Sequence, residues 1–119
     1  MLMNRPFAKA ARKLVLTDGA LATAVREIEN GLVDARLGGF LPKKRIGIDG
    51  RGKSGGLRTV LAYRQASRVV FLYVFGKSDR DNITDAEQQA LSELGDEYMG
   101  MTTERINSLI LSGILQEIR

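Results

Sequence analysis

The sequence predicts an α+β fold in which helices pack on a small antiparallel β-sheet meander. Apolar residues recur at helical spacing near both ends of the chain, and the middle holds one alternating and one nearly continuous apolar segment. Residues 65–67, which lie between these two segments, have the length of a hairpin loop. With 119 residues, the chain is expected to form one domain over residues 1–119, without separate cofactor and substrate modules.

Two helices are expected before the sheet. Residues 7–16 mix Ala, Lys, Arg and Leu, a composition that predicts a short basic helix. Thr17 is a typical N-cap for a second helix, which Gly31 ends. The apolar residues of this helix share one face: Leu21, Ala24, Val25 and Ile28. The segment 32–42 is rich in turn-forming Gly and Pro and is expected to connect this helix to the sheet.

Three strands are expected in the middle of the chain. Residues 43–48 form a short basic segment, and residues 57–64 alternate between two faces, one of which holds Arg58 and Arg64. Residues 69–75 are nearly all β-branched or aromatic, which predicts a central strand that is buried on both faces.

Two further helices are expected after the sheet. Thr84 and Glu87 have the spacing of a capping box at the start of a third helix. Thr102 begins a fourth helix, and residues 114–119 are expected to form an extended tail. This C-terminal part of the domain, residues 84–119, is acidic.

The composition excludes several classes of function. The chain has no cysteine and no histidine, which excludes disulfide frameworks, Ser–His and Cys–His nucleophilic sites, and zinc sites built from these residues. Catalysis would have to use Lys, Arg, Tyr, Asp, Glu, Ser or Thr, and we expect neither a metal nor a cofactor. The longest apolar run has seven residues, far short of the roughly 20 that span a membrane, and no signal-peptide pattern occurs. We therefore expect a cytoplasmic protein that does not contact membranes.

Charge is distributed unevenly along the chain. Residues 1–80 contain 16 Lys and Arg against 6 Asp and Glu, or +10, whereas residues 81–119 contain 2 against 8, or −6. This distribution favours a protein with a basic surface that binds a polyanion, while the opposite surface has another role. The alternative is ordinary surface charge, because halves of a sequence need not be halves of a structure.

Residues Gly47–Ser54 match the phosphate-loop pattern G-x-x-x-x-G-K-S, and Gly50, Gly52 and Gly55 match a dinucleotide-binding pattern. A loop with either pattern binds phosphate only where a helix begins directly after it, because the amides at the helix N-terminus hold the phosphate. Here Gly55-Gly56 would break that helix and residues 57–64 alternate like a strand. We therefore interpret the segment as a glycine-rich turn between two strands, without a nucleotide site.

Residues 43–58 nevertheless hold six basic residues against one acidic residue. A second polar cluster, residues 76–82, follows the central strand, and a meander would bring it near Arg58. Grouped Arg and Lys side chains could hold a phosphodiester and stabilise a charged transition state. They could equally form a solvated rim that an acidic protein contacts, and composition alone does not decide between the two.

The motifs in this region resemble those of the RelE/HigB superfamily of type II toxins. The chain contains K-S-G-G-L-R, then a hydrophobic F-L-Y strand, then F-G-K-S-D-R-D-N-I, and one branch of the superfamily carries this combination at this separation. The resemblance is strongest over residues 43–94 and extends more weakly to the second helix and the C-terminal tail.

This resemblance implies a RelE-like fold and a toxin that cleaves messenger RNA in the ribosomal A site. In that reaction the ribose 2′-hydroxyl attacks the adjacent phosphate, which leaves a 2′,3′-cyclic phosphate and a free 5′-hydroxyl. The implied partners are the ribosome, mRNA and a cognate antitoxin of the helix-turn-helix kind, and operator DNA would be contacted only through that antitoxin.

The resemblance also assigns site residues. Arg58 occupies the position of the arginine expected to grip the scissile phosphate, and four further residues complete the expected catalytic set: Arg51, Lys53, Lys77 and Arg80. The remaining basic and polar residues of the region are expected to bind RNA: Lys43, Lys44, Arg45, Ser54 and Arg64. The chain lacks the tyrosine that many ribonuclease members carry shortly after the second cluster, where Thr84 stands, so the general base is unassigned.

Two alternatives of the same fold stay open. One is a toxin that poisons gyrase, and the other is a module that binds nucleic acid without cleaving it. The paired basic clusters favour the ribonuclease.

Overall fold

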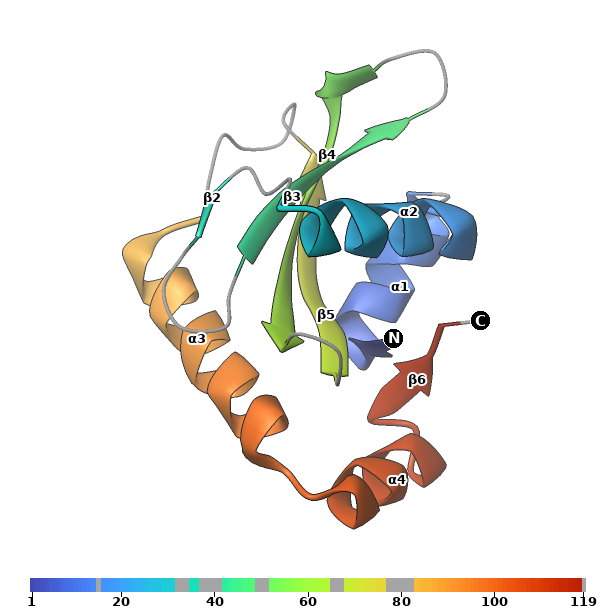
Figure 1. The fold of residues 1–119 in the computed structure, drawn as a ribbon, viewed down its shortest axis with the longest axis vertical. Coiled ribbons are helices and arrows are strands. Elements are labelled where there is room, and N and C mark those ends of the chain that lie inside the picture. The colour runs from blue at the N-terminus through green and yellow to red at the C-terminus, as the bar shows by residue number, and fades with distance from the viewer. Residues whose placement is uncertain are drawn as a thin grey trace.

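The computed structural model describes residues 1–14, 16–31, 35–36, 42–48, 52–64, 68–76 and 83–118, with side chains for all of these except 35–36, 42–48 and 52–56. The elements follow one another as β1 (Leu2–Asn4), α1 (Arg5–Lys13), α2 (Asp18–Glu29), β2 (Ala35–Arg36), β3 (Pro42–Ile48), β4 (Gly52–Arg64), β5 (Arg68–Gly76), α3 (Asp85–Gly100), α4 (Thr103–Leu111) and β6 (Leu115–Glu117). Figure 1 shows the α+β fold that the sequence predicts.

The described strands form one six-stranded sheet in the order β2-β3-β4-β5-β1-β6. The predicted meander is confirmed, because β3 pairs antiparallel with β4 and β4 pairs antiparallel with β5. The sheet is mixed, since β1 runs parallel to β5 and antiparallel to β6. The sequence does not predict β1, because three residues are too few to show alternation. The C-terminal tail is extended as expected and pairs with β1, so the two ends of the chain lie side by side (Figure 1).

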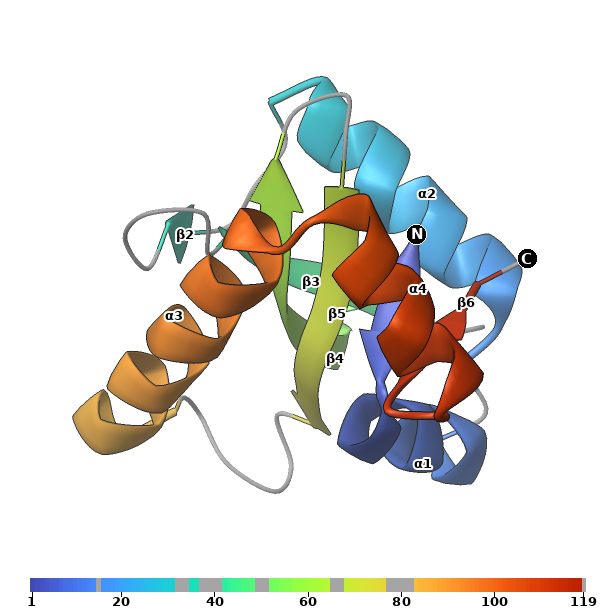
Figure 2. The same ribbon diagram turned by 90° about the horizontal axis from the view of Figure 1, so that it is seen from below.

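Helices cover both faces of the sheet (Figures 1 and 2). On one face, α1 and α2 pack against β4 and β5 around Phe7, Leu21, Leu61 and Phe71. On the other face, α3 packs against β4 and β5 and α4 packs against β6, around a shared core cluster that includes Val60, Leu72, Met99 and Ile106. Strand β5 is therefore buried on both faces, as its composition predicts.

Side-chain caps begin the helices where the sequence places them. Thr17 accepts a hydrogen bond from the Ala20 amide, and Thr102 caps α4 in the same way. Thr84 and Glu87 form the predicted capping box of α3. Helix α1 starts at Arg5, two residues earlier than predicted, because Asn4 caps it. No helix in the described part of the chain is long and apolar enough to cross a membrane.

The phosphate-loop geometry does not form. Strand β4 begins at Gly52, five residues before the predicted start at Leu57, and Gly52 pairs with Ile48 of β3. The helix that a phosphate loop requires is replaced by this strand. The connection between β3 and β4, residues 49–51, lies outside the described residues.

The acidic part of the chain does not lie on the far side of the sheet from its basic strand residues. Helix α3 contains five acidic residues and no basic one: Asp85, Glu87, Glu93, Asp96 and Glu97. It packs on the face that also holds Arg58, because Tyr98 and Met99 are buried in the core cluster that contains Val60. The acidic helix α3 therefore lies on the same face of the sheet as Arg58.

Candidate active site

Arg58 lies in the centre of the sheet, opposite Arg45 of β3 and Phe75 of β5. It alternates with Val60, so it lies on the face that α3 covers. Only 8% of its surface is exposed. Arg58 is therefore a cation in a packed environment, next to a buried aromatic ring.

Burying a guanidinium is costly unless its N–H groups are hydrogen-bonded. No fully buried side-chain nitrogen or oxygen of the described residues lacks a hydrogen-bond partner, so this requirement is met within that part of the chain. A guanidinium held in this way presents its remaining charge in a fixed direction. Fixed donors stabilise developing negative charge without first having to reorganise.

The register of β4 and β5 places the end of β5 beside Arg58. Leu57 pairs with Gly76, the last residue of β5. Lys77, Arg80 and Arg51 lie outside the described residues. Lys53 and Ser54 belong to β4, and Lys43, Lys44 and Arg45 belong to β3, but their side chains are likewise outside the described part.

Arg64 lies apart from Arg58, although both are on the same face of β4. Six residues of extended chain separate them, about 20 Å. The Arg64 guanidinium donates a hydrogen bond to the Met99 carbonyl at the end of α3, with an N–O distance of 2.8 Å. The structure therefore gives Arg64 a role in holding α3, and the candidate site rests on the middle of β4, around Arg58.

A β-bulge places a tyrosine that the sequence analysis overlooked. Val60 pairs with Tyr73 and Leu61 pairs with Phe71, so Leu72 has no partner on β4. The extra residue reverses the alternation of β5, and Tyr73 packs with the cluster of Val60 instead of the opposite one. Tyr73 and Phe75 thus share the face of Arg58, with their ring centroids 5.8 Å apart.

Tyr98 has a clearly shifted protonation equilibrium. It lies on α3 and is buried in the core between that helix and the sheet. Burial raises the pKa of its hydroxyl above the ordinary 10.0, and the neighbouring Glu97 carboxylate raises it further. Tyr98 therefore stays neutral well above physiological pH.

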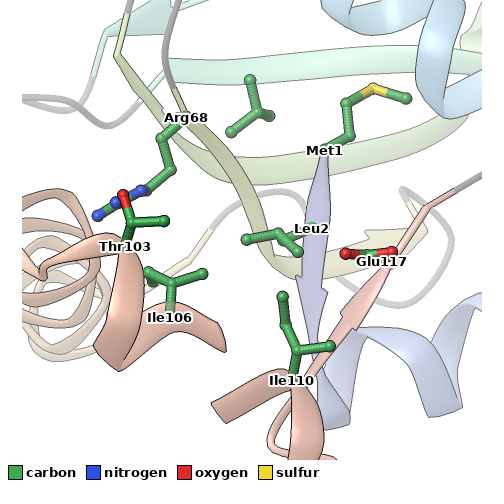
Figure 3. A pocket seen from close by; sticks show the side chains of 8 residues that line it. Met1, Leu2, Arg68, Thr103, Ile106, Ile110 and Glu117 are labelled. Atoms are coloured by element: carbon green, nitrogen blue, oxygen red, sulfur yellow. The ribbon is translucent and has the colours of Figure 1, made fainter. Parts of the chain in front are cut away.

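Figure 3 shows a separate cavity of about 240 Å³ between β1, β5 and α4. Its lining mixes apolar residues with Arg68, Thr103 and Glu117. The Arg68 guanidinium is committed to the carbonyls of Tyr98 and Met101, at 2.6 and 2.8 Å. Arg58 does not line this cavity. Across the described residues, no group of three or more carboxylates could hold a metal ion.

In a comparison with known protein families, a family model matches nearly the whole chain. The family model described as the RelE toxin of the RelE/RelB toxin–antitoxin system matches residues 1–118. A search of curated proteins found no match.

Proposed function

Because this chain belongs to the RelE family of toxins from toxin–antitoxin systems, we propose that it is a ribosome-dependent endoribonuclease that cleaves mRNA in the A site and so inhibits translation. The observation that carries the proposal is Arg58, a nearly buried arginine in the centre of the sheet, opposite Phe75 near the end of β5. In the sequence it closes the basic segment 43–58, and the second basic cluster follows β5. A polyanion is the ligand that such a concentration of cations attracts.

In the proposed reaction, the ribose 2′-oxygen attacks the adjacent phosphorus as it loses its proton, and the 5′-oxygen leaves and gains one. Arg58 holds the non-bridging phosphate oxygens, whose negative charge increases in the transition state. Lys77, Arg80, Arg51 and Lys53 add positive charge around the same phosphate. The proposal requires neither a metal nor a cofactor.

The proposed RNA contacts extend from this centre along β3 and the start of β4. Lys43, Lys44, Arg45 and Ser54 would contact the RNA backbone, whereas Arg64 is left out because it is bonded to α3. Contacts of this kind position RNA without reading its sequence. We further propose that a helix-turn-helix antitoxin silences the toxin in the cytoplasm, and that operator DNA is bound only through this antitoxin.

Induced expression in bacterial cells tests this function and separates it from its alternatives. Incorporation of labelled methionine should fall within minutes while incorporation of labelled thymidine continues. Arg58→Lys should lower the inhibitory potency by roughly 100-fold or more, since one preorganised donor is typically worth that much. A matched Arg12→Lys variant, at an exposed position on α1, should behave like the wild type.

An early loss of thymidine incorporation would instead favour gyrase poisoning. Inhibition of protein synthesis without any cut mRNA would favour a module that binds nucleic acid without cleaving it. Either result would contradict the proposed cleavage.

A further inference from the structure

A second cavity, of about 290 Å³, lies where the first turn of α1 meets the second half of α3 and the turn before β6. Most of its lining is apolar, and among the described residues that form it only Arg5 is charged. Arg58 is not part of the lining, so this cavity is separate from the candidate active site. The lining residues are Asn4, Arg5, Pro6, Leu94, Tyr98 and Ile114.

Tyr98 offers this cavity a hydrogen-bond donor. Its side chain is 6% exposed, with the ring packed in the core between α3 and the sheet. Within the described part of the chain its hydroxyl makes no hydrogen bond, yet no fully enclosed side-chain oxygen there lacks a partner. The hydroxyl oxygen therefore reaches an accessible surface, and the cavity that Tyr98 lines provides one. Because burial raises the pKa of this phenol, it stays protonated and can donate to a carbonyl or carboxylate oxygen.

Arg5 offers the cavity a positive charge. Its Nε atom donates a hydrogen bond to the Gly113 carbonyl, at 3.3 Å, which holds the side chain beside Ile114. A guanidinium has five N–H donors, so the remaining ones can bind a carboxylate through two parallel hydrogen bonds. Lys9 is exposed one helical turn later, and α1 contains basic residues but no acidic one. This wall of the cavity therefore favours an acidic ligand.

The apolar surface continues outside the cavity. Ile114 lines the cavity but is still 44% exposed, and Leu111, the last residue of α4, is 90% exposed. The Ile114 amide donates a hydrogen bond to the Leu109 carbonyl, at 3.0 Å, so the end of α4 fixes this residue in place. Exposed apolar side chains next to a cavity are typical of a surface that a protein partner covers.

We infer that the antitoxin docks on this surface, with an apolar side chain in the cavity, a carboxylate against Arg5 and a hydrogen bond from the Tyr98 hydroxyl. Two observations identify the occupant. Membership of the RelE family implies that an antitoxin binds this chain, and the basic wall of the cavity selects an acidic segment of it. The inference rests on the antitoxin named in the proposed function but not on cleavage of RNA. Since Arg58 does not line the cavity, the contact would anchor the antitoxin outside the catalytic centre.

The test measures the affinity of purified antitoxin for variants of the full-length toxin. The antitoxin is the product of a neighbouring gene that restores growth when both proteins are expressed. Binding should be about 10-fold weaker in Arg5→Gln and about threefold weaker in Tyr98→Phe. The matched controls should bind like the wild type: Lys13→Gln removes a charge from the far end of α1, and Tyr63→Phe removes a hydroxyl from the opposite core cluster.

Wild-type affinity in both Arg5→Gln and Tyr98→Phe would overturn the inference, as would equal losses in the two controls. The inference would also fall if no neighbouring gene product restored growth. Thermal melts of the free variants at pH 7 separate a loss of binding from a loss of folding.

A second measurement uses the wild-type chain and so does not depend on how the variants fold. With ¹³C-labelled isoleucine methyl groups, the NMR signal of Ile114 should shift strongly when antitoxin is added. The signal of Ile28, which is buried in the opposite core cluster, should shift less. An unchanged Ile114 signal at saturation would overturn the inference, and so would the same shift on concentrating the toxin alone, which would identify a second copy as the occupant. The result does not depend on whether the toxin cleaves mRNA.

Discussion

Asn4 is a single buried side chain that connects three parts of the molecule. Its oxygen accepts a hydrogen bond from the Phe7 amide, at 2.9 Å, and so caps α1. Its amide nitrogen donates to the Leu72 carbonyl, at 3.2 Å, where β5 bulges. Leu72 has no partner on β4, so Asn4 supports the bulge from the side of β1. Asn4 thus connects the start of the chain to the bulge that puts Tyr73 on the face of Arg58.

We predict that Asn4→Ala lowers the free energy of unfolding by about 2–4 kcal/mol. Losing a helix cap costs about 1 kcal/mol, and leaving a buried carbonyl without a donor costs about 1–3 kcal/mol more. Thr102→Ala is the matched control, because Thr102 caps α4 but makes no second bond of this kind that the structure describes. Urea unfolding should show a clearly larger loss for Asn4→Ala. Equal losses would mean that the bond to Leu72 contributes nothing.

At the scale of elements, α3 is held by two arginines from the neighbouring hairpin. Arg64 and Arg68 are directly opposite each other on β4 and β5, an unfavourable pairing of like charges. Both point their guanidinium groups at the C-terminal carbonyls of α3, where the helix dipole is negative. The helix has no basic residue in its own last turn, so the sheet supplies the positive charge.

Arg68→Ala is therefore expected to lower the free energy of unfolding by about 2 kcal/mol, since a hydrogen bond from a charged donor contributes about 1.5–3 kcal/mol. Arg64→Ala should cost about 1 kcal/mol, because Arg64 donates to the Met99 carbonyl from an exposed position, where solvent weakens a charged contact. Lys9→Ala, on the exposed face of α1, should change stability by less than about 0.5 kcal/mol. If denaturant unfolding gives Arg68→Ala the same stability as Lys9→Ala, the arginines do not hold the helix.

The contact between α3 and the sheet should also depend on pH. Burial raises the pKa of Tyr98 in the folded chain, so the folded state keeps this proton at a pH where the unfolded state loses it. The stability that this protonated group contributes is complete below the unfolded-state pKa of 10.0 and is lost as the pH rises through the folded-state value. Thermal melts between pH 8 and pH 11 should therefore fall more steeply for the wild type than for Tyr98→Phe. Parallel curves for the two proteins would contradict this.

The elements predicted from sequence are those whose signals are local. The cap at Thr84 and its partner Glu87 are three residues apart, and both hydrogen bonds form within one helical turn. The bulge at Leu72, which sets the face of Tyr73, is hydrogen-bonded to Asn4, 68 positions away in the sequence. No pattern within β5 contains that information. The same holds for Arg68, whose partners follow on α3 about 30 residues later.

At the scale of the whole molecule, the site combines positive charge with the absence of an obvious proton acceptor. Arg58 was singled out from its motif, and it lies opposite Phe75 on the face that α3 covers. Around it, the chain offers Arg, Lys and Tyr but no histidine. Such groups can bind RNA and stabilise charge, but a flexible message in free solution would rarely adopt the in-line geometry that 2′-hydroxyl attack requires.

We propose that the ribosomal A site supplies that geometry. Correct positioning of reacting groups can lower the activation barrier by roughly 7–11 kcal/mol. This is too large a share of the barrier for the small domain to do without. The toxin would then stabilise the charge of the transition state, and the ribosome would orient the mRNA.

Cleavage of one defined mRNA, with and without programmed ribosomes, tests this claim most directly. Primer extension should show cuts within the A-site codon or beside it, within minutes of adding the purified protein to mRNA-programmed 70S ribosomes. The same RNA without ribosomes should stay intact over that time. Equal rates of cleavage in the two conditions would contradict the account.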